Sequence, residues 1–159
     1  TGFAGALAYD YGAGREWSVG ITLGALDVEA ASSAGLGGMH AHSTTVTALL
    51  FGAAWYPEKL TIGQTIRPYA SAAAGAYRRD VSGTTTSLGG TMLQYNASTA
   101  PGIRLVGGVD WFVGRRLRAG ISGGFHLVAD FERQEGLKRS ASGPELSLGL
   151  GVLLGSGRK

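Results

Sequence analysis

The sequence predicts an all-β protein: an antiparallel, up-and-down transmembrane β-barrel of about eight strands, seven of which are visible in the chain. Three observations predict it. Apolar residues alternate with small or polar ones over long stretches, the connections alternate between short and long, and all 3 Trp lie beside a short connection. Strands of ~9–11 residues with an apolar outer side are typical of outer-membrane barrels. Soluble strands are usually shorter, at about 5–6 residues.

The clearest element is a long hairpin over 101–131, with a tight turn at 114–116. In its first limb, Leu105 and Trp111 share the apolar side of the strand, whereas Arg104 falls on the opposite side. The second limb alternates in the same way. A period of two that continues through both limbs predicts paired antiparallel strands.

The same alternation predicts the other strands, which cover 2–11, 16–28, 43–56, 66–78 and 144–155. The segments without alternation are predicted as connections. Three are short, at 12–15, 57–65 and 114–116, and three are long loops, at 29–42, 80–100 and 132–143. Strand extensions around Met92–Tyr95 are an alternative within the second long loop. Short turns at one end and longer loops at the other are typical of an outer-membrane barrel.

Composition limits the alternatives. The 159 residues predict a single domain over 1–159, and the 28 Gly are spread through the apolar segments rather than gathered in a linker. There is no Cys, and a net charge of +3 is too small and scattered to indicate a nucleic-acid partner. His40 and His42 have a spacing that fits metal chelation, but no third ligand lies nearby, so we expect a solvated loop, no metal and no cofactor.

The tryptophans have a regular placement. Trp17 follows the first short connection, and Trp55 and Trp111 precede the second and third. All lie on the side predicted to be apolar. Because amphipathic rings gather at membrane–water interfaces, we interpret them as an aromatic girdle at one rim of the barrel.

The pattern resembles the small outer-membrane barrels of the outer-membrane protein A and X type. The resemblance rests on Arg67-Pro68-Tyr69, which leads a strand ending in Gly75-Ala76-Tyr77, and on the hairpin GVDWFVGRRLRAGISGGF. It implies a location in the bacterial outer membrane, in contact with the lipid bilayer and lipopolysaccharide. The chain departs from the family in its odd strand number and in its ending, LLGSGRK, which lacks a terminal aromatic residue. We therefore expect one further strand upstream of Thr1, and either a continuing periplasmic domain or partner or a divergent lineage.

Charged residues on the polar side of the strands are the first candidates for a functional site. They are Glu16, Arg104, Asp110, Arg118, His126, Asp130 and Glu145. The turn at 114–116 predicts that Asp110 lies diagonal to Arg118 and that Arg104 faces His126. Because isolated interior charges are costly, we favour a structural network that fills the lumen over a gate or a proton path.

A catalytic alternative is also visible. His126 is a candidate base for Ser147 if the last two strands pair around Leu137, with Glu145 or Asp130 orienting the ring. Small outer-membrane barrels that trim lipid A use Ser and His, but their substrate lies outside the barrel and these residues point inward. We therefore predict that the chain is not an enzyme.

The sequence thus favours a non-enzymatic outer-membrane barrel, a structural anchor whose loops at 29–42, 80–100 and 132–143 contact an extracellular partner. Three alternatives stay open: a lipid-modifying enzyme, a narrow porin-like pore, and a soluble lipocalin-like ligand-binding barrel. The last requires the apolar side of the strands to face inward.

Overall fold

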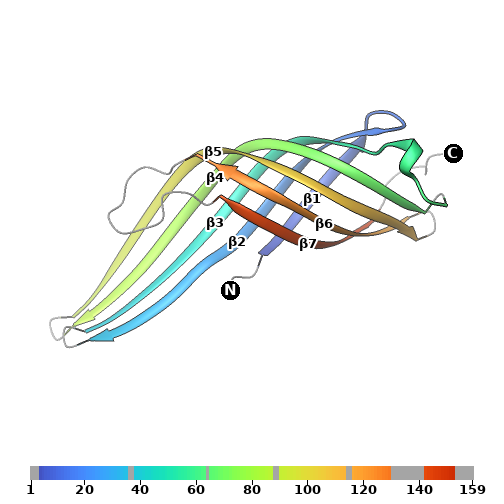
Figure 1. Ribbon diagram of the computed structural model, residues 1–159. Coiled ribbons are helices and arrows are strands. Elements are labelled where there is room, and N and C mark those ends of the chain that lie inside the picture. The colour runs from blue at the N-terminus through green and yellow to red at the C-terminus, as the bar shows by residue number, and fades with distance from the viewer. Residues whose placement is uncertain are drawn as a thin grey trace.

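The computed structural model describes residues 4–35, 38–63, 65–87, 90–113, 116–129 and 142–152. They form a single 7-stranded antiparallel sheet, in which each strand pairs with its neighbour in the chain. The sheet curls into a half-barrel (Figure 1). Its strands are β1 (Ala4–Gly12), β2 (Trp17–Gly35), β3 (Gly38–Trp55), β4 (Ile66–Ser87), β5 (Gly90–Val113), β6 (Leu117–Val128) and β7 (Gly143–Val152). The predicted all-β, up-and-down fold is confirmed.

The polar side of the strands is the concave side of the sheet. Arg118 on β6 reaches Asp10 on β1, with 3.5 Å between Nη2 and Oδ2, although four strands lie between them in the sheet order. Tyr77 on β4 likewise meets His126 on β6 across the width of β5. Side chains of non-adjacent strands can meet in this way only on the inside of the curve.

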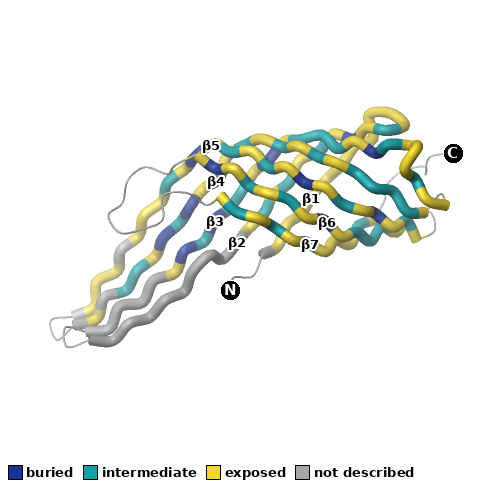
Figure 2. The backbone as a smooth tube through the Cα atoms, viewed as in Figure 1, coloured by how far each residue is buried: buried dark blue, intermediate teal, exposed yellow. Residues whose placement is uncertain are grey.

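The convex side carries the large apolar side chains, which remain exposed. Leu150 on β7 is 93 % exposed and Leu7 on β1 is 78 % exposed. The same side of the inner strands carries Phe51 and Leu105, at 61 % and 48 %. In Figure 2 exposed positions recur along every strand of the curved part of the sheet. The alternation seen in the sequence therefore corresponds to an apolar outer surface and a polar inner one.

A small apolar cluster lies on the concave side, where β3, β4, β5 and β6 meet. It consists of Val46, Leu50, Tyr77, Ala100 and Val128, all buried. Gly102 lets the Tyr77 ring approach, because a Cβ at that position would lie 2.7 Å from Tyr77 Cε2. Aromatic rings that cover strand glycines in this way help to fix strand register.

Four strands continue well beyond the others. β1 makes its first pair with β2 at Leu26, and β6 makes its last pair with β5 at Gly102, yet β4 has 22 residues and β5 has 24. At ~3.3 Å per residue, β5 is about 80 Å long. Together β2 to β5 form a four-stranded sheet that projects from one end of the half-barrel (Figure 1). We call the part beyond Leu26 and Gly102 the projecting sheet.

The predicted loops at 29–42 and 80–100 are therefore wrong. Glu29 to Gly35 pair with Thr44 to Gly38 after a register shift between Asp27 and Glu29, and Asp80 to Ser87 pair with Ala97 to Gly90. Exposed side chains occur on both faces of projecting β5, with Met92 at 69 % and Leu93 at 82 %. Because both faces of β5 are exposed from Thr91 to Leu93 and from Tyr95 to Ala97, the sequence has no reason to alternate there. The third predicted loop, 132–143, lies largely outside the described residues.

The short connections are confirmed at the opposite end of the half-barrel. The second of them contains the chain's only described helix, the 3₁₀ turn η1 (Glu58–Leu60), followed by a bridge between Ile62 and Ile66. Gly63 occupies the left-handed region there, with φ of 59°. No helix in the described part of the chain is long and apolar enough to cross a membrane.

β1 and β7 are the two edges of the sheet. Because every neighbouring pair is antiparallel, these two odd-numbered strands run in the same direction. Their outward side chains are among the most exposed in the molecule, as Leu148 at 83 % illustrates.

Candidate functional site

The concave face holds two clusters of charged and hydroxyl side chains. The first lies toward the projecting sheet and is centred on Glu145 of β7. Arg104 donates from Nε to both Glu145 oxygens, at 3.1 and 3.0 Å, and from Nη2 at 2.5 Å. His126 Nε2 also bonds Glu145, and His126 Nδ1 lies 2.7 Å from the Tyr77 hydroxyl. Four side chains from β4, β5, β6 and β7 are thus joined in one chain of hydrogen bonds.

The second cluster lies toward the short connections and is centred on Asp110 of β5, which is 4 % exposed. The Tyr56 hydroxyl donates to Asp110 Oδ2 at 3.0 Å, and Arg118 Nη1 approaches the same oxygen at 3.4 Å. Arg118 also reaches Asp10 through Nη2. One guanidinium therefore links two carboxylates that belong to opposite parts of the curved sheet.

The predicted relations within the interior set agree with this geometry. Arg104 is the register partner of His126, and Asp110, paired with Gly120, lies diagonal to Arg118. Asp130 lies outside the described residues. Each described carboxylate in the two clusters has a cationic neighbour within 4 Å. This pairing is what makes charges tolerable on a crowded inner surface, since an unpaired one would pay a large desolvation penalty.

Glu16 does not join either cluster. The strand begins at Trp17, so Glu16 falls in the short connection, where its carboxylate accepts the Glu58 backbone N–H at 2.9 Å and the Trp55 indole N–H at 3.4 Å. These two N–H donors lower the pKa of Glu16, the backbone donor contributing most. Glu16 therefore ties the first short connection to η1, with help from the Tyr56 N–H, which donates to the Glu16 carbonyl at 2.7 Å.

The three tryptophans lie on the outward side at this same rim. Trp17 and Trp55 are register partners with ring centroids 6.5 Å apart. Trp111 pairs with Ile66 at the start of β4. They are 52 %, 41 % and 57 % exposed, respectively. The three half-exposed rings therefore lie beside the short connections, at one end of the half-barrel, as the sequence predicted.

The catalytic pairing of His126 with Ser147 is not present. β6 and β7 pair His126 with Gly143 and Ser122 with Ser147, so the register differs by four residues from the one that the dyad requires. Ser147 instead bonds Ser122, with 2.7 Å between the two hydroxyl oxygens. The register could not be read from the sequence because the connection between the strands is long and carries no turn signal.

His40 and His42 belong to β3 rather than to a loop, where their backbones pair with Ser33 and Ala31. Within the described part of the chain, no three His, Cys, Asp or Glu side chains gather closely enough to hold a metal ion.

Three members of the clusters were missed by the sequence analysis: Asp10, Tyr56 and Tyr77. Asp10 could have been predicted, because the alternation places it on the small-residue side of its strand, together with Ala6 and Ala8. Tyr77 gave no usable signal, since Ala occupies both sides of β4. Tyr56 lies just past the end of β3, so periodicity does not apply to it.

Comparison with known proteins adds no relative: no family model, curated protein or solved structure matches the chain. The features of the chain that bear on function are therefore the half-barrel, its two surfaces and the projecting sheet.

Proposed function

We propose that this chain is a non-enzymatic β-barrel of the bacterial outer membrane, which anchors the projecting sheet outside the cell so that it contacts a partner. The observation that carries the proposal is the inversion of polarity: large apolar side chains cover the convex face, and paired charges occupy the concave one. An apolar outside and a polar inside is the arrangement of an outer-membrane barrel.

Dimensions support the same proposal. β1, β6 and β7 have 9, 12 and 10 residues, close to the ~9–11 that a tilted membrane-spanning strand requires. Along β5, the twelve steps from Trp111 to Thr99 cover about 40 Å, or roughly 28 Å along the membrane normal at a tilt of ~45°. That height is close to the ~25 Å apolar band of such barrels. On the neighbouring β4 the outward side becomes polar at the same level, where Arg78 is followed by Asp80 and Ser82.

The lipocalin-like alternative gains no support from the polarity, because it needs an apolar concave face. The pore alternative gains little, because paired charges from β1, β5, β6 and β7 cross the concave face at two levels. An enzyme of the lipid-trimming kind would need the Ser–His contact that the register of β6 and β7 does not make.

A partner-binding role for the projecting sheet is supported by its edges. Beyond Leu26 in β2 and beyond Gly102 toward the start of β5, no neighbouring strand is paired in the described residues. Unpaired edges are ready to add a further strand, which is a common mode of peptide recognition. Exposed Met92, Leu93 and Tyr95 on the β5 edge add apolar contact surface.

Single cysteines test this arrangement cleanly, since the chain has none of its own. In intact cells, a membrane-impermeant maleimide should label Thr86→Cys on the projecting sheet. Lys59→Cys in η1 should react only after the outer membrane is permeabilised. Leu148→Cys, on the outward apolar side, should stay unreactive in both conditions and react after unfolding. Labelling of Leu148→Cys in intact cells, or equal labelling of the two ends, would contradict the proposal.

A further inference from the structure

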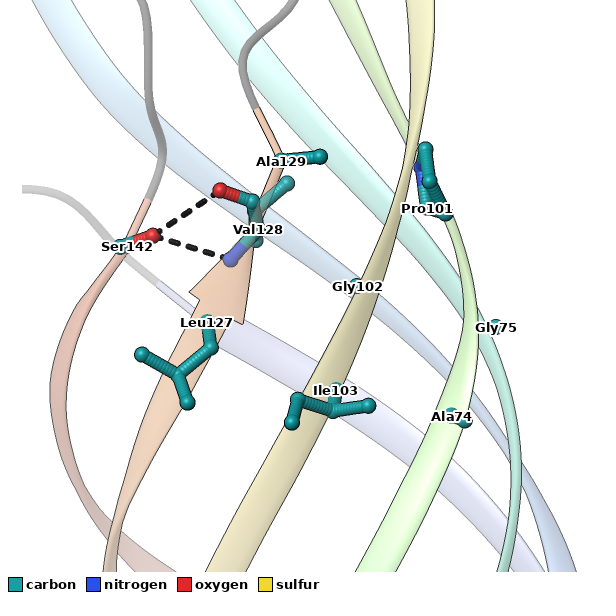
Figure 3. A pocket seen from close by; sticks show the side chains of 9 residues that line it. All are labelled: Ala74, Gly75, Pro101, Gly102, Ile103, Leu127, Val128, Ala129 and Ser142. Atoms are coloured by element: carbon teal, nitrogen blue, oxygen red, sulfur yellow. Dashed lines mark hydrogen bonds between the residues drawn. The ribbon is translucent and has the colours of Figure 1, made fainter.

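An open groove of about 650 Å³ lies on the sheet where β6 ends and β4 and β5 continue into the projecting sheet. Its side chains are small or apolar: Ala74, Pro101, Ile103, Leu127 and Ala129 (Figure 3). Ser142 lies at one end, with its hydroxyl already hydrogen-bonded to the backbone of Val128. The groove therefore offers apolar contact without an unsatisfied polar group.

The groove opens on the convex face. Ile103 and Leu127 are register partners, and both belong to the exposed apolar side of the sheet. Tyr77 covers the other side of the neighbouring Gly102, on the concave face. The hollow arises because β4 presents only alanines outward between Tyr69 and Tyr77, while its neighbours present larger residues; the alanines are Ala70, Ala72, Ala74 and Ala76. It is thus a recess within the apolar outer surface.

A fixed cation lies directly beyond the groove. Arg78 is the next outward residue of β4 after Ala76, about 7 Å further along the strand. Its side chain is 57 % exposed, with Nε donating to Asp80 Oδ1 at 3.1 Å and Nη2 donating to Tyr95 at 3.3 Å. The Tyr95 hydroxyl also donates to Asp80, at 2.6 Å. These contacts hold the guanidinium in place and leave Nη1 without a hydrogen-bond partner among the described residues.

We propose that this groove binds one membrane phospholipid with a net negative headgroup, with an acyl chain along Ala74, Ile103 and Leu127 and the phosphate against Arg78. The apolar recess and the cation are in the order that an amphiphile requires, and Arg78 lies at the level where the outward face changes from apolar to polar. A groove of this size is within the range of ~300–1,000 Å³ seen for small-molecule sites. Asp80 holds Arg78 in position but also reduces its net charge, so the chain contact carries most of the affinity.

This inference rests on the proposed membrane location, and it is tested by native mass spectrometry of the full chain released from detergent. The protein is incubated with 1-palmitoyl-2-oleoyl-phosphatidylglycerol or with the phosphatidylcholine of the same chains. We expect one phosphatidylglycerol to be retained per chain, and less phosphatidylcholine. Arg78→Gln should weaken phosphatidylglycerol binding about two- to fivefold, the upper part of the range expected for an exposed ion pair. Ala74→Phe, which fills the groove, should abolish retention of both lipids.

Arg116→Gln provides the matched control, because Arg116 is an exposed cation in the third short connection, beyond the end of β5 that lies far from the groove. It should leave lipid retention unchanged. Added inorganic phosphate at millimolar concentration should not displace the lipid; displacement would indicate a simple anion site and overturn the proposal. Equal retention of the two lipids, or no effect of Arg78→Gln, would also overturn it. Failure of the protein to enter lipid vesicles would instead refute the proposed function, so the two failures are distinguishable.

Discussion

Glu145→Gln is the most informative single change on the concave face, because one carboxylate there serves two partners. The substitution keeps the shape of the side chain but leaves Arg104 without a counter-charge and removes the anionic acceptor of His126. The side chains of Arg104 and Glu145 are 22 % and 17 % exposed, so both are largely desolvated. Breaking a buried ion pair by removing one partner costs about 3–5 kcal/mol.

We take the lower end of that range, about 3 kcal/mol, because β7 is an edge strand and a fifth of each side chain still meets solvent. The measurement is the free energy of unfolding in detergent micelles, from urea titrations followed by Trp fluorescence. Ser122→Ala is the matched control: it removes a neutral hydrogen bond from the same face and should cost about 1 kcal/mol. Adding Arg104→Met to Glu145→Gln should recover a large part of the loss, since no unpaired charge then remains. A cost below about 1 kcal/mol for Glu145→Gln would refute the view that this pair is desolvated.

Two further predictions concern the rim and the core, and a third concerns the projecting sheet. The pKa of Glu16 is lowered in the folded chain from an ordinary value of 4.5. The ionised carboxylate therefore contributes its full stabilisation above that value, and this stabilisation is lost as the pH falls through the lowered pKa. Acid unfolding curves should show this loss in the wild type and not in Glu16→Gln. Gly102→Val should destabilise the fold by about 1–3 kcal/mol, because its Cβ meets the Tyr77 ring, whereas Gly149→Ala, with nothing within 4 Å, should be nearly neutral in the same urea titrations. Amide hydrogen exchange should show protection through 80–87 and 90–100; exchange at the rate of an open loop would contradict the pairing of β4 with β5.

Periodicity made the curved part of the sheet predictable. Wherever one face of a strand meets apolar surroundings and the other meets a crowded polar interior, the sequence must alternate, as it does at Leu105 and Arg104. The same logic explains the failure within 80–100. A strand such as the one carrying Met92 and Leu93, exposed on both faces, is under no such constraint. Its Gly, Ser and Thr residues then look like those of a loop.

The polar clusters were predictable only where a tight turn fixes the register. The turn between β5 and β6 placed Arg104 opposite His126 correctly. The long connection before β7 does not fix the register of β6 and β7. In the register that the structure shows, Glu145 rather than Ser147 reaches His126. Contacts between strands that are not neighbours, such as Arg118 with Asp10, depend on the curvature of the whole sheet. No local pattern in the sequence encodes that curvature.

The shared direction of β1 and β7 restricts how this sheet can lose its edges. If the two edges met directly, their ladder would be parallel, unlike every other ladder in the sheet. A second copy inserted into the same membrane in the same orientation offers only edges that run the same way, so dimerisation through these strands meets the same obstacle. An odd number of added antiparallel strands, the first and last of which run opposite to β1 and β7, satisfies both edges at once. One such strand with an apolar and a polar face is the smallest addition that pairs both edges in the antiparallel way of the other ladders.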